Sequence, residues 1–213
     1  MKKNFADNLM GIIGETYRLI EARRSMTDGM QFLDLRDEDA FKNLDSDFAT
    51  AEEGITKVDV WRSELNEEEF KMYSLEEVKA DRRVLGTGNI IYEALSSSNK
   101  LGWTELTLAD TIRYYGLDED WKVVKGWVVD VRKWREWFRY LHRFAHGKEK
   151  GEKVTAQRQA PNGRTIWACN INEMVYDGVA KEVEINRAIS DTVYSMYKDE
   201  IALAKRMREA LVE

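Results

Sequence analysis

Six arginines are placed where a protein could bind the phosphates of double-stranded DNA. They are Arg132, Arg135, Arg139, Arg143, Arg158 and Arg164. The first four are spaced by three, four and four residues, which aligns them on one face of a helix. The last two flank a proline-containing turn between two expected strands. Since DNA carries one phosphate charge per roughly 1.7 Å, the sequence predicts a cationic helix face on the backbone or major groove and two arginines at the minor groove.

The other reactive side chains lack partners at a useful spacing. His142 and His146 lie four residues apart, as metal ligands on a helix do, but no third ligand is marked by spacing. The glutamates at 67–69 are expected to form a solvated face, and Cys169 lies on an apolar strand, where a packed thiol is expected. The sequence therefore predicts no catalytic residues, no metal, no cofactor and no enzymatic activity.

Charge is distributed unevenly along the 213 residues. Residues 27–81 carry 17 acidic and 6 basic side chains, whereas residues 122–164 carry 12 basic and 4 acidic ones. This distribution predicts two surfaces with different partners, the acidic one suited to a protein partner, although charge runs can also be plain solvated faces. The hydrophobic content of 43% is sufficient for a folded core.

The amino-terminal segment and the cysteine content predict a cytoplasmic protein. One cysteine excludes an internal disulfide and fits a reducing compartment. The opening MKKNFADNLMGIIGETYRLIE contains charged residues that interrupt every apolar stretch, so neither a signal peptide nor a membrane span is expected.

Long amphipathic helices are expected at both ends of the chain. Apolar residues recur at spacings of three and four in residues 4–24 and again in residues 172–212. A helix of about forty residues spans roughly 60 Å, which exceeds the width of a small domain. It should therefore pack on the amino-terminal helix or on a second copy, which predicts a homodimer. Residues 27–81 are expected to hold short helices, one of them capped by Ser74.

The central segment is predicted to contain three helices and one hairpin. IIYEAL and TLADTIRYYGL are expected as short helices, and the basic aromatic run before Gly147 as a longer one. The intervening WKVVKGWVVDV suits a helix or a strand by periodicity. VTAQRQAPNGRTIWACNI is a hairpin with a well-marked turn. This order, over residues 88–171, resembles the winged helix-turn-helix superfamily, and the resemblance implies that the hairpin is a DNA-binding wing.

Together these patterns predict a mainly α protein with a central winged-helix module and one β-hairpin. Its regions are expected at 1–81, 82–171 and 172–213, with terminal helices flanking the module. The expected function is DNA binding in transcriptional control, or in replication or maintenance of a genetic element. The alternative is an adaptor or inhibitor that binds another protein through its acidic segment.

Overall fold

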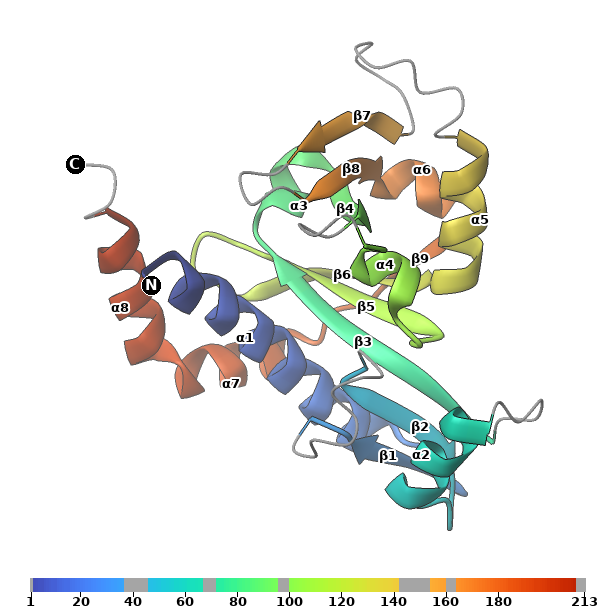
Figure 1. Cartoon of the computed structure of the whole chain (residues 1–213). Coiled ribbons are helices and arrows are strands. Elements are labelled where there is room, and N and C mark those ends of the chain that lie inside the picture. The colour runs from blue at the N-terminus through green and yellow to red at the C-terminus, as the bar shows by residue number, and fades with distance from the viewer. Residues whose placement is uncertain are drawn as a thin grey trace.

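The chain folds around two β-sheets and is an α/β protein, so the predicted mainly α class is wrong. The computed structural model describes residues 2–36, 46–66, 72–95, 100–141, 154–159 and 164–209. In this part of the chain the larger sheet has six strands in the order β1-β2-β3-β5-β6-β9, and the smaller has three in the order β4-β8-β7 (Figure 1). The larger sheet contains β1 (Met30–Asp34), β2 (Phe48–Glu52), β3 (Tyr73–Asp81), β5 (Thr111–Leu117), β6 (Val123–Asp130) and β9 (Ala180–Val183). The smaller contains β4 (Asn89–Leu95), β7 (Val154–Gln159) and β8 (Thr165–Asn170).

β3 is the strand on which the larger sheet changes direction. β1, β2 and β3 form an antiparallel meander, β5 runs parallel to β3, and β6 and β9 follow antiparallel. The ladder between β2 and β3 ends at the Phe48–Glu76 pair, whereas β5 stays paired with β3 as far as Asp81. On the side where β2 lies, residues 77–81 of β3 therefore pair with no described strand, and their backbone groups can bond to side chains.

Helices from both ends of the chain cover one face of the larger sheet. They are α1 (Lys2–Ser25), α7 (Arg187–Met196) and α8 (Lys198–Glu209). Their core includes the fully buried Ile13 and Tyr17 of α1, packed with Tyr115 of β5 and with Val193 of α7. The predicted amino-terminal helix is thus present, and it packs against the carboxyl-terminal helices within one chain (Figure 1). A homodimer through these helices stays a prediction.

The long helix predicted over 172–212 is wrong. The segment contains α6 (Ile171–Tyr176), the strand β9, and then α7 and α8. Gly178, with a φ of +72°, takes the left-handed conformation after α6. The side chain of Asn186 caps α7 by accepting hydrogen bonds from the backbone amides of Ala188 and Ile189, at 3.1 and 3.2 Å. Gly178 and Asn186 therefore interrupt a segment whose apolar spacing, taken alone, predicts a single helix.

The opposite face of the larger sheet is covered by the smaller sheet and short helices. The helices here are α3 (Arg83–Thr87), α4 (Trp103–Leu106), α5 (Val131–Leu141) and α6. The rings of Tyr92 and Phe138 stack with their centroids 3.8 Å apart, and Trp134 meets Tyr92 edge to face. Cys169 is buried in the same core, and burial raises the pKa of its thiol to about 12. The expected packed thiol is confirmed.

Two of the three helices expected in residues 88–171 are strands. IIYEAL lies in β4, and TIRYYGL forms β5. The strand β5 contributes Ile112 and Tyr114 to one core and Tyr115 and Leu117 to the core on the other face. Because both faces are buried, the apolar residues lose the alternation that identifies a half-buried strand. The third helix is present as α5, the hairpin as β7 and β8, and VVKGWVVD is the strand β6.

The acidic segment 27–81 is also richer in strands than predicted. Its described part holds β1, β2, the helix α2 (Lys57–Asn66) and β3. The helix expected after Ser74 is wrong, because both Ser74 and Leu75 belong to β3. Leu75 is fully buried against α2 and β2. Residues 67–69 lie outside the described residues.

Candidate functional site

Three of the predicted DNA-binding arginines have described side chains that contact other side chains of the chain. The guanidinium of Arg139 lies 2.7 Å from the carboxylate of Glu105, and that of Arg164 lies 3.0 Å from the carboxylate of Glu93. Arg132 is largely exposed and reaches Glu136 only at 4.0 Å. Intramolecular carboxylates thus engage part of the cationic stripe, and DNA binding by these arginines stays a prediction.

Arg135 is held by backbone carbonyl groups. Its guanidinium donates hydrogen bonds to the carbonyl oxygens of Thr104, at 2.8 Å, and Thr107, at 2.6 Å. Arg135 therefore ties α5 to the segment that carries α4. Arg143 lies outside the described residues, as do His142 and His146, and of Arg158 only the backbone in β7 is described.

We expect Arg135→Ala to lower the free energy of unfolding by about 1–3 kcal/mol, because it leaves two partly buried carbonyl groups without their donor. The exposed Arg132, one turn earlier, is the matched control, and Arg132→Ala should change stability by no more than about 0.5 kcal/mol. Urea unfolding of the two variants measures the difference. Equal stabilities would contradict the structural role of Arg135.

A surface cleft lies where β3 extends beyond the β2 ladder and faces the first half of α1. Its lining residues are Asp7, Asn8, Gly11, Ile12, Glu15, Asp47 and residues 77–80. The helix and the strand approach closely at Gly14, where a Cβ atom would lie 2.8 Å from the Cβ of Ala80. This close approach places Glu15, the next residue of α1, beside the open edge of β3.

Asp47 is the residue of this cleft whose carboxyl group is influenced by several neighbouring charges. It directly precedes β2, and its carboxylate accepts a hydrogen bond of 2.7 Å from the backbone amide of Val78 on the open edge of β3. Burial and then the negative charge of Glu15 raise the pKa of Asp47 to about 6, although the Val78 hydrogen bond and the positive charges of Lys79 and Arg36 oppose the rise. A carboxyl group with a raised pKa in a cleft is a candidate for a functional role.

Glu77 and Lys79 belong to the same edge of β3, but their side chains point to the face opposite α1, because Val78 and Ala80 pack against α1. The ammonium of Lys79 forms an ion pair with the carboxylate of Glu77. The side chain of Glu77 is 7% exposed and that of Lys79 is 36% exposed, so the lysine reaches solvent while the glutamate is enclosed. On the α1 side, Arg36 pairs with Glu15 at 3.0 Å. The cleft therefore brings together the carboxylates of Glu15 and Asp47, with Arg36 paired to Glu15 next to it and the Glu77–Lys79 ion pair on the other face of β3.

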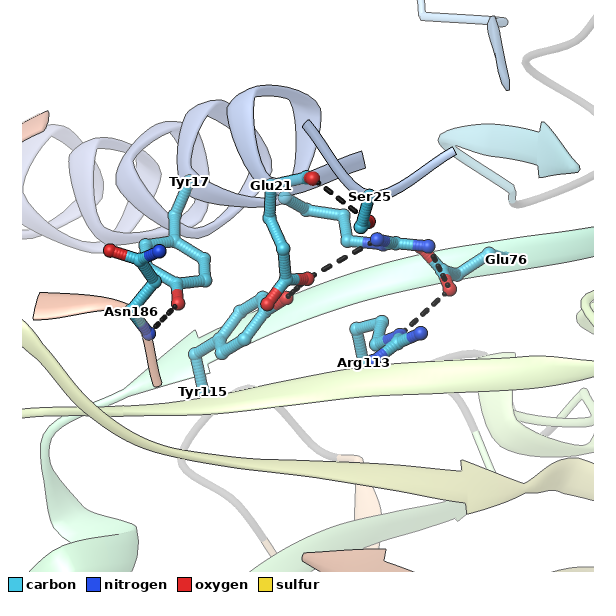
Figure 2. Close-up of polar contacts among 8 residues, drawn as sticks. Tyr17, Glu21, Ser25, Glu76, Arg113, Tyr115 and Asn186 are labelled. Atoms are coloured by element: carbon cyan, nitrogen blue, oxygen red, sulfur yellow. Dashed lines mark hydrogen bonds and ion pairs between the residues drawn. The ribbon is translucent and has the colours of Figure 1, made fainter. Parts of the chain in front are cut away.

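A buried ion-pair network fixes α1 against β3 next to the cleft. Glu76 accepts hydrogen bonds from Arg18 at 2.5 and 3.3 Å and from Arg113 at 2.9 Å, so its carboxylate lies between two guanidinium groups (Figure 2). Glu21 accepts from Arg18 at 3.2 Å and from the hydroxyl of Tyr115 at 3.3 Å. The network joins α1, β3 and β5, and so holds the two elements that line the cleft in a fixed relation.

No protein-family model matches the chain, and neither a curated protein nor a solved structure matches it. In the described part of the chain, no helix is long and apolar enough to cross a membrane. Among the same residues, no three His, Cys, Asp or Glu side chains are grouped as a ready-made metal centre.

Sequence reasoning missed the cleft because its residues are far apart in the chain. Glu15 falls within a helix stripe, and Asp47, Glu77 and Lys79 fall within the acidic segment. One local signal is present. The run LEEVKA, residues 75–80, mixes charged and apolar residues within a largely buried strand, where unpaired charges are costly.

Proposed function

We propose that the chain is a divalent-cation-dependent hydrolase of phosphodiester bonds in nucleic acid, with the cleft between α1 and β3 as its active site. The observation that supports this is the proximity of the carboxylates of Glu15 and Asp47 in one open cleft along the edge of β3. A carboxyl group with a raised pKa beside a second acid in a cleft is a pattern found in catalytic centres. The expectation that the chain is not an enzyme is replaced by this proposal.

The carboxylates of the cleft suit Mg²⁺. This ion prefers oxygen ligands and is usually held by one or two carboxylates, with waters and substrate phosphates completing its shell. The lack of a ready-made group of three ligands among the described residues is compatible with that mode of binding. Burial and then the negative charge of Glu15 raise the pKa of Asp47, and a bound cation would relieve the repulsion between the two carboxylates. We therefore assign Asp47 as the main ligand, with Glu15 beside it.

The charged side chains at this edge of β3 have separate proposed roles in phosphodiester hydrolysis. When bound, the cation lowers the pKa of water and stabilises negative charge on the phosphate. Lys79, whose side chain is 36% exposed at the same edge of β3, is the lysine that we assign to donate to the phosphate and to offset charge that develops in the transition state. Glu77 holds that ammonium, and Arg36 balances the charge of Glu15.

Nucleic acid is the substrate class that the surroundings favour. The cleft is lined by one helix and one strand edge, and we propose that a phosphodiester of a longer polymer binds in it. Phosphodiesters are the anionic groups that a lysine, an arginine and a divalent cation bind together. Double-stranded DNA, proposed as a partner from the arginine spacing, is the first substrate to test. The adaptor alternative is less well supported, because Asp47, Glu76 and Glu77 of the acidic segment are engaged inside the fold.

The test is cleavage of end-labelled single- and double-stranded DNA and RNA with Mg²⁺ or Mn²⁺, and with a chelator. We expect cleavage only with the cation, and a rise in melting temperature on adding Mg²⁺ to the free protein. Lys79→Met should lower kcat on the order of 100-fold without losing the fold. Lys125→Met, which changes an exposed lysine on β6, should keep full activity. Absence of both cleavage and Mg²⁺ stabilisation would refute the proposal.

A further inference from the structure

The open edge of β3 presents backbone groups that no described residue binds. The amide of Asp47 donates to the carbonyl oxygen of Glu76 at 2.9 Å, and the amide of Val78 donates to the carboxylate of Asp47 at 2.7 Å. Glu76 and Val78 therefore point their backbone groups away from β5, and Ala80 does the same, because this direction alternates along a strand. The carbonyl oxygen of Val78, and the amide and carbonyl oxygen of Ala80, are without a hydrogen-bond partner in the described part of the chain.

We propose that this edge binds an adenine base, with the Val78 carbonyl oxygen accepting from its amino group and the Ala80 amide donating to the adjacent ring nitrogen. Along the edge, the open groups are an acceptor, a donor and an acceptor. Adenine offers an amino donor next to a nitrogen acceptor, whereas guanine and uracil have a carbonyl oxygen in place of the amino group. The inference deepens the proposed function and rests on it for the polymer that carries the base.

The bond between Asp47 and Val78 limits what can occupy the edge. An added β-strand needs the amide of Val78, and this amide already donates to the Asp47 carboxylate. What is left is a run of three groups on two residues, Val78 and Ala80. A planar base needs only two or three adjacent groups, so a base fits this edge better than a strand does.

The charge of the cleft favours an amino-substituted base. Asp47 and Glu15 place carboxylates beside this edge, and an ionised carboxylate accepts hydrogen bonds but donates none. The second hydrogen of the adenine amino group can be donated to Asp47, whereas the carbonyl oxygen of guanine or uracil would be repelled there. Cytosine also carries an amino group beside a ring nitrogen, but its carbonyl oxygen would face the carbonyl oxygen of Ala80.

The helix α1 supplies an apolar surface for one face of the base. Ile12 lines the cleft and is 42% exposed, and Gly11 beside it has no side chain. A Cβ atom built at Gly11 has Glu15 Oε1 as its nearest described neighbour, at 3.7 Å, so the helix leaves room at this point. Small-molecule sites commonly combine apolar walls with a few placed backbone groups, as found here.

The test titrates the protein with nucleosides in the presence of a chelator, so that neither cleavage nor a cation contributes. Lys79-Ala80 is the only Lys-Ala pair in the sequence, so isotope labelling of lysine carbonyl carbons and alanine nitrogens isolates the Ala80 amide signal. Adenosine should shift this signal, whereas guanosine and uridine should not. Ile12→Ala should weaken adenosine binding about 3- to 10-fold, and Leu203→Ala, which changes an exposed leucine of α8, should leave it unchanged.

Analogues of adenosine test each hydrogen bond without altering the protein. Purine riboside lacks the amino group and 1-deazaadenosine lacks the acceptor nitrogen, so each should bind about 2- to 10-fold more weakly. 2-Aminoadenosine adds a donor for the carbonyl oxygen of Ala80 and should bind more tightly by a similar factor. Equal affinities across these analogues, or a shift of the Ala80 signal by guanosine or uridine, would overturn the inference.

The outcomes separate this inference from the proposed function. Adenosine binding in a protein that cleaves no nucleic acid would refute the hydrolase and leave the base site standing. Cleavage together with an Ala80 signal that no nucleoside shifts would do the reverse. Because a bound adenine cannot be paired in a duplex, single-stranded oligo(dA) should compete with adenosine if nucleic acid is the source of the base. Tight binding of adenosine monophosphate without such competition would instead support a free nucleotide as the source.

Discussion

Asp47→Asn should lower metal-dependent cleavage on the order of 1,000-fold or more and, at the same time, make the protein more stable at neutral pH. Activity is lost because an amide is neutral and cannot replace the carboxylate that we assign as the main cation ligand. Stability rises because the native state holds the Asp47 carboxylate in a buried position near Glu15, which disfavours its charge. Asparagine keeps an oxygen that can accept the hydrogen bond from Val78.

The raised pKa of Asp47 determines how the stability gained by Asp47→Asn depends on pH. The pKa of Asp47 is about 6 in the folded protein, against an ordinary value of 3.8, so between these values the folded state binds a proton that the unfolded state releases. The charged Asp47 carboxylate therefore lowers the free energy of unfolding by its full amount above about pH 6. This loss of stability disappears as the pH falls toward about 4. Two pKa units correspond to about 3 kcal/mol, which is the upper limit of the gain expected for Asp47→Asn at pH 8.

Urea unfolding at several pH values between 4 and 8, without divalent cations, measures this difference. The exposed Asp28 provides the control, because Asp28→Asn should follow the wild type across this range. Adding Mg²⁺ at pH 8 should stabilise the wild type and leave Asp47→Asn unchanged. An Asp47→Asn protein that is less stable than the wild type at pH 8, or that still responds to Mg²⁺, would contradict the assignment of Asp47.

Glu76→Ala is expected to lower the free energy of unfolding by about 3–5 kcal/mol, more than any other substitution in its ion-pair network. Glu76 lies between the guanidinium groups of Arg18 and Arg113 (Figure 2), and its removal leaves the buried Arg18 with Glu21 as its remaining acidic partner. Breaking a buried pair from one side costs several kcal/mol, because the surviving charge stays out of water.

Two comparisons make this expectation specific to the network. Arg18→Met should cost less than Glu76→Ala, because Glu76 keeps its contact with Arg113 at 2.9 Å. Glu182→Ala, which removes an exposed carboxylate of β9, should change stability by less than about 1 kcal/mol. Thermal unfolding of the three variants is the measurement. A Glu76→Ala protein as stable as Glu182→Ala would show that the network does not hold α1 on the sheet.

The sequence predicted the elements whose signals are local. The apolar stripe of α1, the arginine and tryptophan spacing of α5, and the turn of the β7–β8 hairpin are all contained in short segments. The strands β4, β5 and β6 carry apolar residues toward two cores, so their periodicity did not separate helix from strand. The parallel pairing of β3 with β5 joins residues more than thirty positions apart, and no local pattern marks it.

The candidate site could not be predicted from the sequence for a related reason. Its acidic residues come from α1, from the residue before β2, and from β3, and only the pairing of these elements brings them together. The six predicted arginines are marked by their spacing on one helix and around one turn. Spacing indicates which side chains share a face, but it does not reveal whether Glu93, Glu105 or a carbonyl group already occupies that face.

The pairing of β2 with β3 ends at Glu76, and the adjacent residues Glu76 and Glu77 have different roles. Side chains alternate along a strand, so Glu76 joins the ion pairs under α1, whereas Glu77 pairs with Lys79 on the opposite face. Loss of a single residue between Tyr73 and Glu76 would bring Glu77 under α1 in place of Glu76 and turn Glu76 to the opposite face, and would so disturb folding and the proposed chemistry together. The length of this half of β3 is thus tied to both properties, and natural variation in it should be far more restricted than its plain acidic composition suggests.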